Sequence, residues 1–311
     1  AIDKGKSVEF VYPDGFGMDI FYHVFKFNDR EMDLAKVDRI LLFDEEKTND
    51  PTNTKAWFIS YDTRRYIEAD VTNLTFSTFE EAPVYFPAQE VEVHKYQAAY
   101  PAPMSEIELT EALFPDPTVV RQSYTESGVR SYTDGSRELK LFTNAHYLTF
   151  INPTRSGDPP APQQPVALQA FRFINNHGGF TEHFLLSRIR DLPDHKNQIV
   201  FRMFFNGYLT FGAWVGEIDV IWQGTEVFEY SRSTQSFKTS VIYEEPDTIR
   251  LPSVSDMEQF FEQSDQYELG RIRNITLGYT IDEYEDYVIF SPNWYFLYDG
   301  EWSALMDDDE K

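Results

Sequence analysis

The residues that could carry catalysis or bind a metal are few in this chain, and they are scattered along it. Among its six histidines, His177 and His183 lie six residues apart, with Glu182 beside the second. A metal site at this spacing is the less favoured hypothesis. The favoured interpretation is a turn after a helix followed by a histidine at the end of a strand.

Paired carboxylates could indicate glycoside hydrolysis, and adjacent acids occur at Glu244-Glu245, Asp282-Glu283 and Glu285-Asp286. The chain holds 52 acidic residues, so such pairs arise by chance. The phosphate-binding glycine loops, the G-x-S-x-G elbow and the H-E-x-x-H motif do not occur, and there is no cysteine. The sequence therefore predicts no catalytic residue, no cofactor and no metal site, which means a protein that is not an enzyme.

Aromatic residues offer a second kind of surface. The five tryptophans could line a sugar-binding groove, but in sheets such residues are more often core or cross-strand partners, and we favour the core for Trp57, Trp214, Trp222, Trp294 and Trp302.

The charge balance excludes one class of partner. With 27 basic and 52 acidic residues, the formal net charge is −25, and a field of that sign repels nucleic acid. The simplest explanation of this negative charge is a well-solvated surface. The alternative is that the protein works in surroundings rich in polyanions or binds a basic partner. No apolar run approaches the roughly 18–20 residues of a membrane span.

Three segments predict a helix followed by strands, and they begin near residues 105, 165 and 254. Ser105 precedes Glu108, and Ser255 precedes Glu258, at the spacing of a capping box. The middle helix has apolar residues at helical spacing from Val166 and is ended by Gly178-Gly179. Each helix precedes runs of alternating apolar residues, which are typical of strands.

Prolines divide the chain. Tyr100-Pro101-Ala102-Pro103 marks one boundary, and the proline-rich segment from 153 to 165 marks another. We therefore predict a β-rich α+β chain of several domains with repeated helix-plus-antiparallel-sheet modules. The expected domains are a β-rich region over 1–100, a helix-plus-meander module over 101–160, and a domain with two helix-plus-sheet units over 161–311. The first region is expected to be truncated, because Ala1-Ile2-Asp3-Lys4-Gly5-Lys6 is interpreted as a cut rather than a natural start.

Three glycine-containing pairs are predicted to form structural turns: Asp134-Gly135, Gly178-Gly179 and Asn206-Gly207. Gly135 should have a positive φ angle in a tight turn between two strands. His177 and the two glycines after it should end a helix, with a glycine in the left-handed conformation; a binding loop is the alternative.

Four passages resemble the YycH family of Gram-positive bacteria. They are Arg130-Ser131-Tyr132-Thr133-Asp134-Gly135-Ser136-Arg137, Phe173-Ile174-Asn175-Asn176-His177-Gly178-Gly179-Phe180, Val200-Phe201-Arg202-Met203-Phe204-Phe205-Asn206-Gly207, and Leu277-Gly278-Tyr279 with Ser291-Pro292-Asn293-Trp294. The first passage and Asn152-Pro153 are also similar to YycI, the companion family. The resemblance covers about residues 105–311 well.

The resemblance implies PepSY-like modules in the later domains, with a YycI-like domain at the C-terminal end. It also implies an N-terminal transmembrane helix outside this sequence, with the present region on the extracytoplasmic side. The expected partners are a YycI-like protein and the sensor histidine kinase WalK (YycG), and the expected role is control of cell-wall metabolism.

Two rival functions stay open at this point. A secreted carbohydrate- or wall-binding protein would show exposed, clustered Trp and Tyr side chains beside two carboxylates. A protease-inhibiting module would show an exposed edge strand or loop able to enter a protease cleft.

Overall fold

The computed structural model describes residues 7–17, 34, 36–44, 54–60, 63–69, 74–78, 90–99, 102–125, 128–153, 164–212, 214–237, 242–264, 266–284 and 287–305. The chain divides into two compact units, Ala1–Val84 and Tyr85–Lys311. The fold is mixed α/β and rich in sheet, and the described residues contain three α-helices. None of these helices is long and apolar enough to cross a membrane.

The first unit contains an antiparallel meander of five strands that follow one another in sequence order. They are β1 (Ser7–Phe16), β2 (Val37–Asp44), β3 (Thr54–Ser60), β4 (Arg65–Ala69) and β5 (Leu74–Thr78). Alternate residues turn to opposite faces of a strand, and the buried side chains here follow that period: Ile40 lies opposite Phe58, which lies opposite Ile67.

The second unit is organised by one continuous sheet with the strand order β18-β6-β20-β19-β14-β13-β15-β16-β11-β10-β9-β8. Two more strands join it, since β12 pairs with β13 and β21 pairs with β20. Only the β14–β19 pair is parallel among the described pairs of this sheet. The strands are β6 (Val91–Ala99), β8 (Arg121–Tyr124), β9 (Val129–Thr133), β10 (Glu138–Phe142), β11 (Tyr147–Ile151), β12 (Phe184–Leu192), β13 (Lys196–Phe205), β14 (Tyr208–Gly212), β15 (Glu217–Gln223), β16 (Glu226–Ser233), β18 (Ile242–Leu251), β19 (Ile272–Glu283), β20 (Tyr287–Tyr298) and β21 (Glu301–Ala304). A short separate pair joins β7 (Ala102–Pro103) to β17 (Gln235–Ser236).

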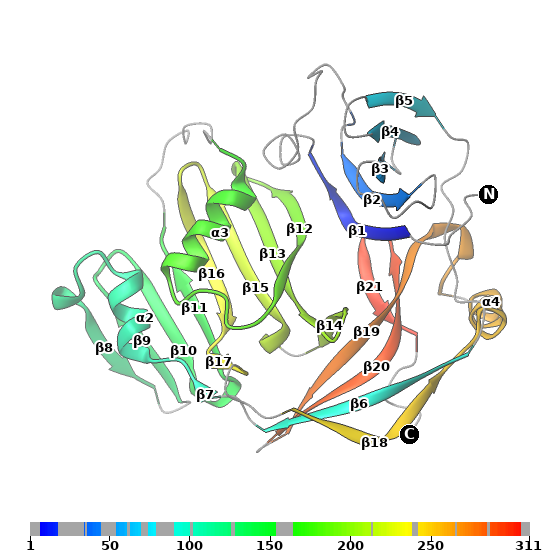
Figure 1. Ribbon diagram of the computed structural model, residues 1–311. Coiled ribbons are helices and arrows are strands. Elements are labelled where there is room, and N and C mark those ends of the chain that lie inside the picture. The colour runs from blue at the N-terminus through cyan, green and yellow to red at the C-terminus, as the bar shows by residue number, and fades with distance from the viewer. Residues whose placement is uncertain are drawn as a thin grey trace. The chain divides into compact units, whose positions relative to one another are not determined.

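The helices lie on the sheet at the three predicted places. They are α2 (Glu106–Leu113), α3 (Val166–Asn176) and α4 (Val254–Gln263). Figure 1 shows α2 and α3 on the same side of the strands from β8 to β16. One apolar cluster joins both helices to these strands, and a second cluster joins Met257 and Phe261 of α4 to β19 and β20. The helix-then-sheet arrangement is therefore present three times, while its PepSY-like character stays a prediction.

The start of α4 differs from the prediction. The helix begins after Ser253, and the carboxylate of Asp256 accepts hydrogen bonds from the Ser253 backbone N (3.0 Å) and from Ser253 Oγ (2.7 Å). The Ser255–Glu258 capping box was wrong by two residues, because both spacings satisfy the same pattern and an Asp can close the box as well as a Glu. At α2 the predicted cap is present, with Ser105 Oγ accepting from Glu108 N at 3.3 Å.

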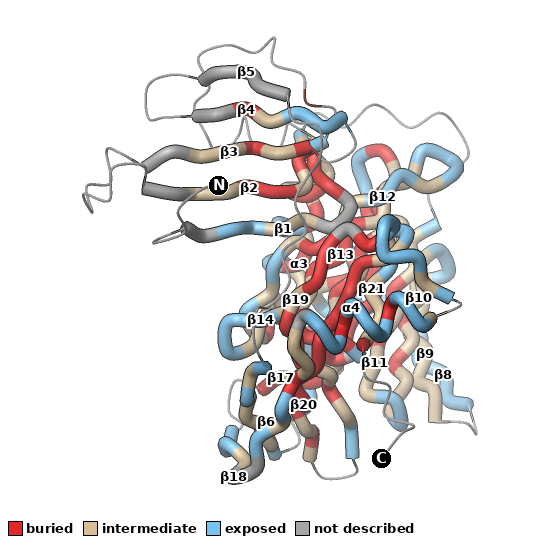
Figure 2. Tube along the Cα trace, turned by 90° about the vertical axis from the view of Figure 1, so that its right-hand side faces the viewer, coloured by how far each residue is buried: buried red, intermediate tan, exposed pale blue. Residues whose placement is uncertain are grey.

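Buried residues concentrate where the helices and the central strands meet, as the red segments of β13, β19 and β20 in Figure 2 show. Strand β6, which we assigned to the region 1–100, pairs with β18 and β20 and therefore lies in the second unit. The division of the chain lies after Val84 rather than near residue 100. Residues 101–160 and 161–311 share one sheet through the pairing of β11 with β16.

Candidate interaction surface

The two histidines considered for metal binding have different surroundings. His177 follows α3, where its ring stacks on Phe173 at 4.0 Å and its Nδ1 lies 2.6 Å from Phe173 O. Burial lowers the pKa of His177 below its usual value. His183 is exposed just before β12. Within the described residues, no three His, Asp or Glu side chains are grouped so that they could hold a metal ion.

The described tryptophans do not form an exposed row. Trp222 and Trp294 are buried, and Trp302 packs beside Phe211 with ring centroids 5.7 Å apart. Trp57 is half-buried against Tyr66 in the first unit. The indole rings thus contribute to packing, which leaves the sugar-groove hypothesis without its expected surface in the described part of the chain.

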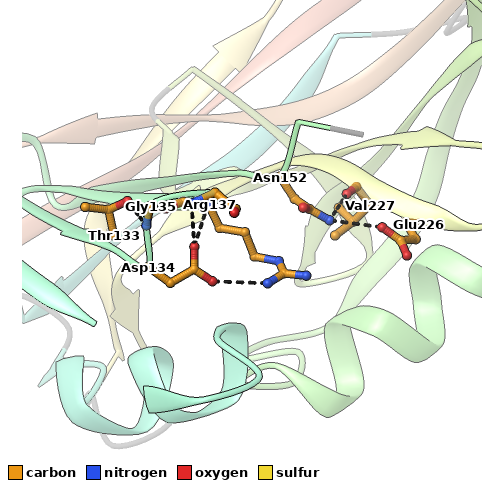
Figure 3. Close-up of polar contacts among 8 residues, drawn as sticks. Thr133, Asp134, Gly135, Arg137, Asn152, Glu226 and Val227 are labelled. Carbon is orange, nitrogen blue, oxygen red and sulfur yellow. Dashed lines mark hydrogen bonds and ion pairs between the residues drawn. The ribbon is translucent and has the colours of Figure 1, made fainter. Parts of the chain in front are cut away.

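The Asp134-Gly135 pair begins the loop between β9 and β10, and Figure 3 shows its contacts. Asp134 Oδ1 accepts from the backbone N of Ser136 (2.8 Å) and Arg137 (2.7 Å), and Oδ2 accepts from Arg137 Nη1 (3.1 Å). Burial opposes ionisation of Asp134, but these hydrogen bonds outweigh it and lower its pKa. Gly135 has a φ angle of 92°.

Replacing Gly135 with valine should lower the free energy of unfolding by about 1–2 kcal/mol. A Cβ at this position meets nothing within 4 Å, so the whole effect comes from forcing a β-branched residue to a positive φ angle. Urea unfolding measures the change. Gly135→Asn provides the control, since asparagine tolerates the left-handed region, and a neutral valine variant would contradict the assignment.

The other two pairs also lie at turns. Gly178 and Gly179 have φ angles of 97° and 68°, and Gly179 N donates to Ile174 O at 2.8 Å as α3 ends. Asn206 and Gly207 connect β13 to β14 with φ angles of 48° and 89°. In both pairs the positive φ angles let the backbone turn where an element ends. Asn206 Nδ2 also donates to Tyr96 Oη at 2.9 Å, so this turn makes a distant contact as well.

Near the end of α3 lies a residue that the sequence analysis missed. Arg232 on β16 is 1% exposed. Its guanidinium donates to Gly179 O (2.6 Å), Thr181 Oγ1 (3.1 Å), Tyr230 Oη (3.1 Å) and Ser233 O (3.2 Å). All of these acceptors are neutral, so a buried cation joins the loop after α3 to the strand beneath it. The sequence pattern hides it, because a β-bulge near Phe228 puts Tyr230 and Arg232 out of the alternation that begins at Val227.

The face of the sheet opposite α2 and α3, here called the helix-free face, is different in character. Along β15, Ile218, Val220 and Trp222 turn toward the helices, so Glu217, Asp219 and Ile221 turn away. Cross-strand pairing adds the neighbours that share this face. The helix-free face includes Glu138, Lys140, Phe142, Tyr147, Thr149, Ile151, Lys196, Gln198, Val200, Arg202, Glu217, Asp219, Ile221, Gln223, Glu229, Ser231 and Ser233. Its longer side chains are partly exposed, whereas Val200, Ser231 and Ser233 are buried.

Asp219 is the unusual group on this face. Burial raises its pKa to about 6; the hydrogen bond from Gln198 Nε2 (2.6 Å) opposes that change, and the charges of Glu217 and Glu229 add to it. Arg188 on β12 has the opposite effect on the pKa. Asp219 Oδ1 is buried and has no hydrogen-bond partner among the described residues. At neutral pH the folded chain therefore holds a carboxylate in surroundings that favour its protonated form.

Asp219→Asn should stabilise the protein at pH 7.5 by up to about 3 kcal/mol. The folded-state pKa lies above the unfolded value, so the wild-type protein is penalised above about pH 6 and the penalty fades as the pH falls toward 4. The two proteins should thus differ most above pH 7 and converge near pH 4. Thermal unfolding across that range measures this. A difference that does not depend on pH would contradict the explanation.

Taken together, fold and surface define a sheet-rich, mixed α/β protein with a helix-free, partly acidic sheet face. The family described as YycH protein, C-terminal domain, matches residues 81–308. This chain belongs to the YycH family.

Two similar proteins come from Bacillus subtilis. The two-component system WalR/WalK regulatory protein YycH of strain 168 is 20% identical over 303 residues, and the match covers 88% of this chain and 64% of that protein. The chain thus spans under two thirds of that relative's length. The crystal structure of YycH from Bacillus subtilis has a similar fold, with a TM-score of 0.68, 17% identity, and coverage of 97% of this chain and 80% of that one.

Proposed function

We propose that this chain is a non-enzymatic regulatory protein of a WalR/WalK-type two-component system. The observation that carries the proposal is the match of residues 81–308 to the YycH family, together with the relative that is named a regulatory protein of that system. The chain would act outside the cytoplasmic membrane, anchored by a transmembrane helix that is not within this sequence. Its partners would be the sensor kinase and a YycI-like protein, and the process controlled would be cell-wall metabolism.

Regulation of this kind needs binding energy rather than chemistry. A bound protein shifts a kinase between two states only by the difference between its affinities for those states. A rigid sheet with a helix-free face suits this task, because its surface side chains are held in place by the strands. In this proposal the three helix-plus-sheet units are PepSY-like modules, divided into 101–160 and 161–311, and the first two units present that face.

Deleting the gene in its host tests the proposal. Transcription of wall-hydrolase genes that depend on the kinase should change by about fivefold or more, and the membrane-anchored protein should co-purify with the kinase and the YycI-like protein. Re-expression from a plasmid should restore transcription. Unchanged kinase output, with purified protein that cleaves wall glycan or peptide, would contradict the proposal.

One observation favours a second candidate function, the inhibition of a protease. Strand β8 pairs only with β9 among the described residues, and all four of its residues are exposed. Thr125 N donates to Val129 O, so alternate residues point toward β9 and the backbone groups of Gln122 and Tyr124 point outward. Such an edge can receive an extended peptide, as a protease-inhibiting module requires. Inhibition assays with wall-associated proteases distinguish this candidate from the regulatory function.

A further inference from the structure

The helix-free face holds two carboxylates that form no ion pair with any other described residue. Glu138 pairs with Lys140 at 3.2 Å, and Glu217 pairs with Arg202. The nearby Arg188 and Arg190 both pair with Glu301 on β21, at 3.1 and 2.8 Å. Lys196, on the same face of β13, lies over the Phe228 ring with its Nζ 3.6 Å from the ring centroid. The described cations around this face therefore contact other groups.

Asp219 and Glu229 are the two acids that remain. Between described residues, neither forms an ion pair with a lysine, arginine or histidine. Asp219 accepts a hydrogen bond from Gln198, and the charge of Arg188 lowers its pKa without a direct ion pair. The register places them as diagonal neighbours, because Asp219 lies opposite Ser231 and Ile221 lies opposite Glu229. Two unbalanced carboxylates thus lie side by side on adjacent strands.

Apolar side chains surround this pair. Ile221 and Ile151 flank Glu229 on both sides, since each is paired directly with it across the strands. Tyr147 lies four residues before Ile151 on β11, opposite Ser233, and its pKa is raised by burial and also by the charges of Asp219 and Glu229. The centre of this face thus consists of half-buried apolar side chains around a carboxylate without an ion-pair partner. Protein–protein interfaces have this composition at their hot spots.

We propose that the helix-free face around Asp219, Ile221 and Glu229 is the docking surface for a partner protein that presents a lysine or arginine among apolar side chains. The occupant follows from charge complementarity: the two carboxylates form no ion pair among the described residues, and the described cations at this face contact other groups. A cation that enters beside Asp219 would also relieve the unfavourable burial of its charge. This inference deepens the proposed function, on which the choice of binding partners below rests.

Binding measurements on the whole purified chain test the surface. The probes are the extracytoplasmic domain of the host's WalK-type kinase and the soluble domain of its YycI-like protein. The double variant Asp219→Asn with Glu229→Gln should weaken binding of one of them by about tenfold, and the salt dependence of its affinity should become less steep. Glu111→Gln removes one charge from the exposed side of α2 and should change affinity by less than about twofold.

Misfolding cannot mimic the expected result, because Asp219→Asn should raise the stability of the chain while it weakens binding. If the wild-type chain binds a probe and the double variant binds it equally well, the docking surface is wrong and the proposed function stands.

Photo-crosslinking in the host separates the remaining outcomes. A benzoylphenylalanine in place of Ile221 in the membrane-anchored protein should form an adduct with a peptide of the kinase or the YycI-like protein that contains a lysine or arginine, and Asp219→Asn should abolish it. An Asp219-dependent adduct with a basic peptide of a different protein supports the surface but contradicts the proposed function. An adduct with a second copy of the chain, or no adduct at Ile221, overturns the proposed docking surface.

Discussion

Gly278→Ala should lower the free energy of unfolding by about 3 kcal/mol, although it adds a single methyl group. Gly278 lies on β19, where a Cβ would be 2.5 Å from Phe211 Cε2 and 2.9 Å from Tyr295 Cδ2. Those two rings stack on each other at 3.6 Å, so neither can move without losing the contact with the other. Urea unfolding of the whole chain measures the loss.

Gly270→Ala is the matched control for this substitution. It makes the same chemical change in the turn before β19, where a Cβ would meet nothing within 4 Å. Its effect should stay within about 0.5 kcal/mol. If both variants unfold at the same urea concentration as the wild-type protein, the space above Gly278 is not closed by the aromatic pair.

Arg232→Met should cost about 3 kcal/mol of stability. Methionine matches the length of the side chain, but it leaves Gly179 O, Thr181 Oγ1 and Tyr230 Oη without their donor in a site that water does not reach. Chemical unfolding gives the magnitude. Arg232→Lys should recover part of the loss, since an ammonium can satisfy some of the acceptors.

Arg121→Met on the exposed strand β8 is the comparison, and it should be close to neutral. An Arg232→Met protein that is as stable as the wild type, or more so, would show that the desolvation of this cation exceeds the value of its four hydrogen bonds.

The helices could be predicted from the sequence because caps and apolar spacing act within a few residues. Ser105 and the glycines after His177 mark ends that depend on local backbone groups. The predicted turn at Gly135 likewise needs no knowledge of distant residues. By contrast, we did not predict that β6 belongs to the later sheet. Its partners β18 and β20 lie far along the chain, and no local sequence pattern indicates which strands will pair with it.

The candidate surface could not be predicted for a related reason. Asp219 and Glu229 are ordinary acids in the sequence, and they become neighbours only through the register of β15 with β16. The same holds for Arg232, whose acceptors lie on a loop about 50 residues earlier in the chain. Burial and pairing across strands are properties of the completed sheet.

The position of β6 also bears on how the protein reaches its native state. This strand is made early, yet its two neighbours in the sheet are β18 and β20, and Tyr279 Oη donates to His94 O (3.4 Å) across 185 residues of sequence. Contacts of such sequence separation slow folding, because a long loop must close before they form. Until β18 has been synthesised, β6 has both of its edges unpaired, and one edge stays unpaired until β20 follows. During that interval the nascent chain is most open to wrong strand pairing and aggregation.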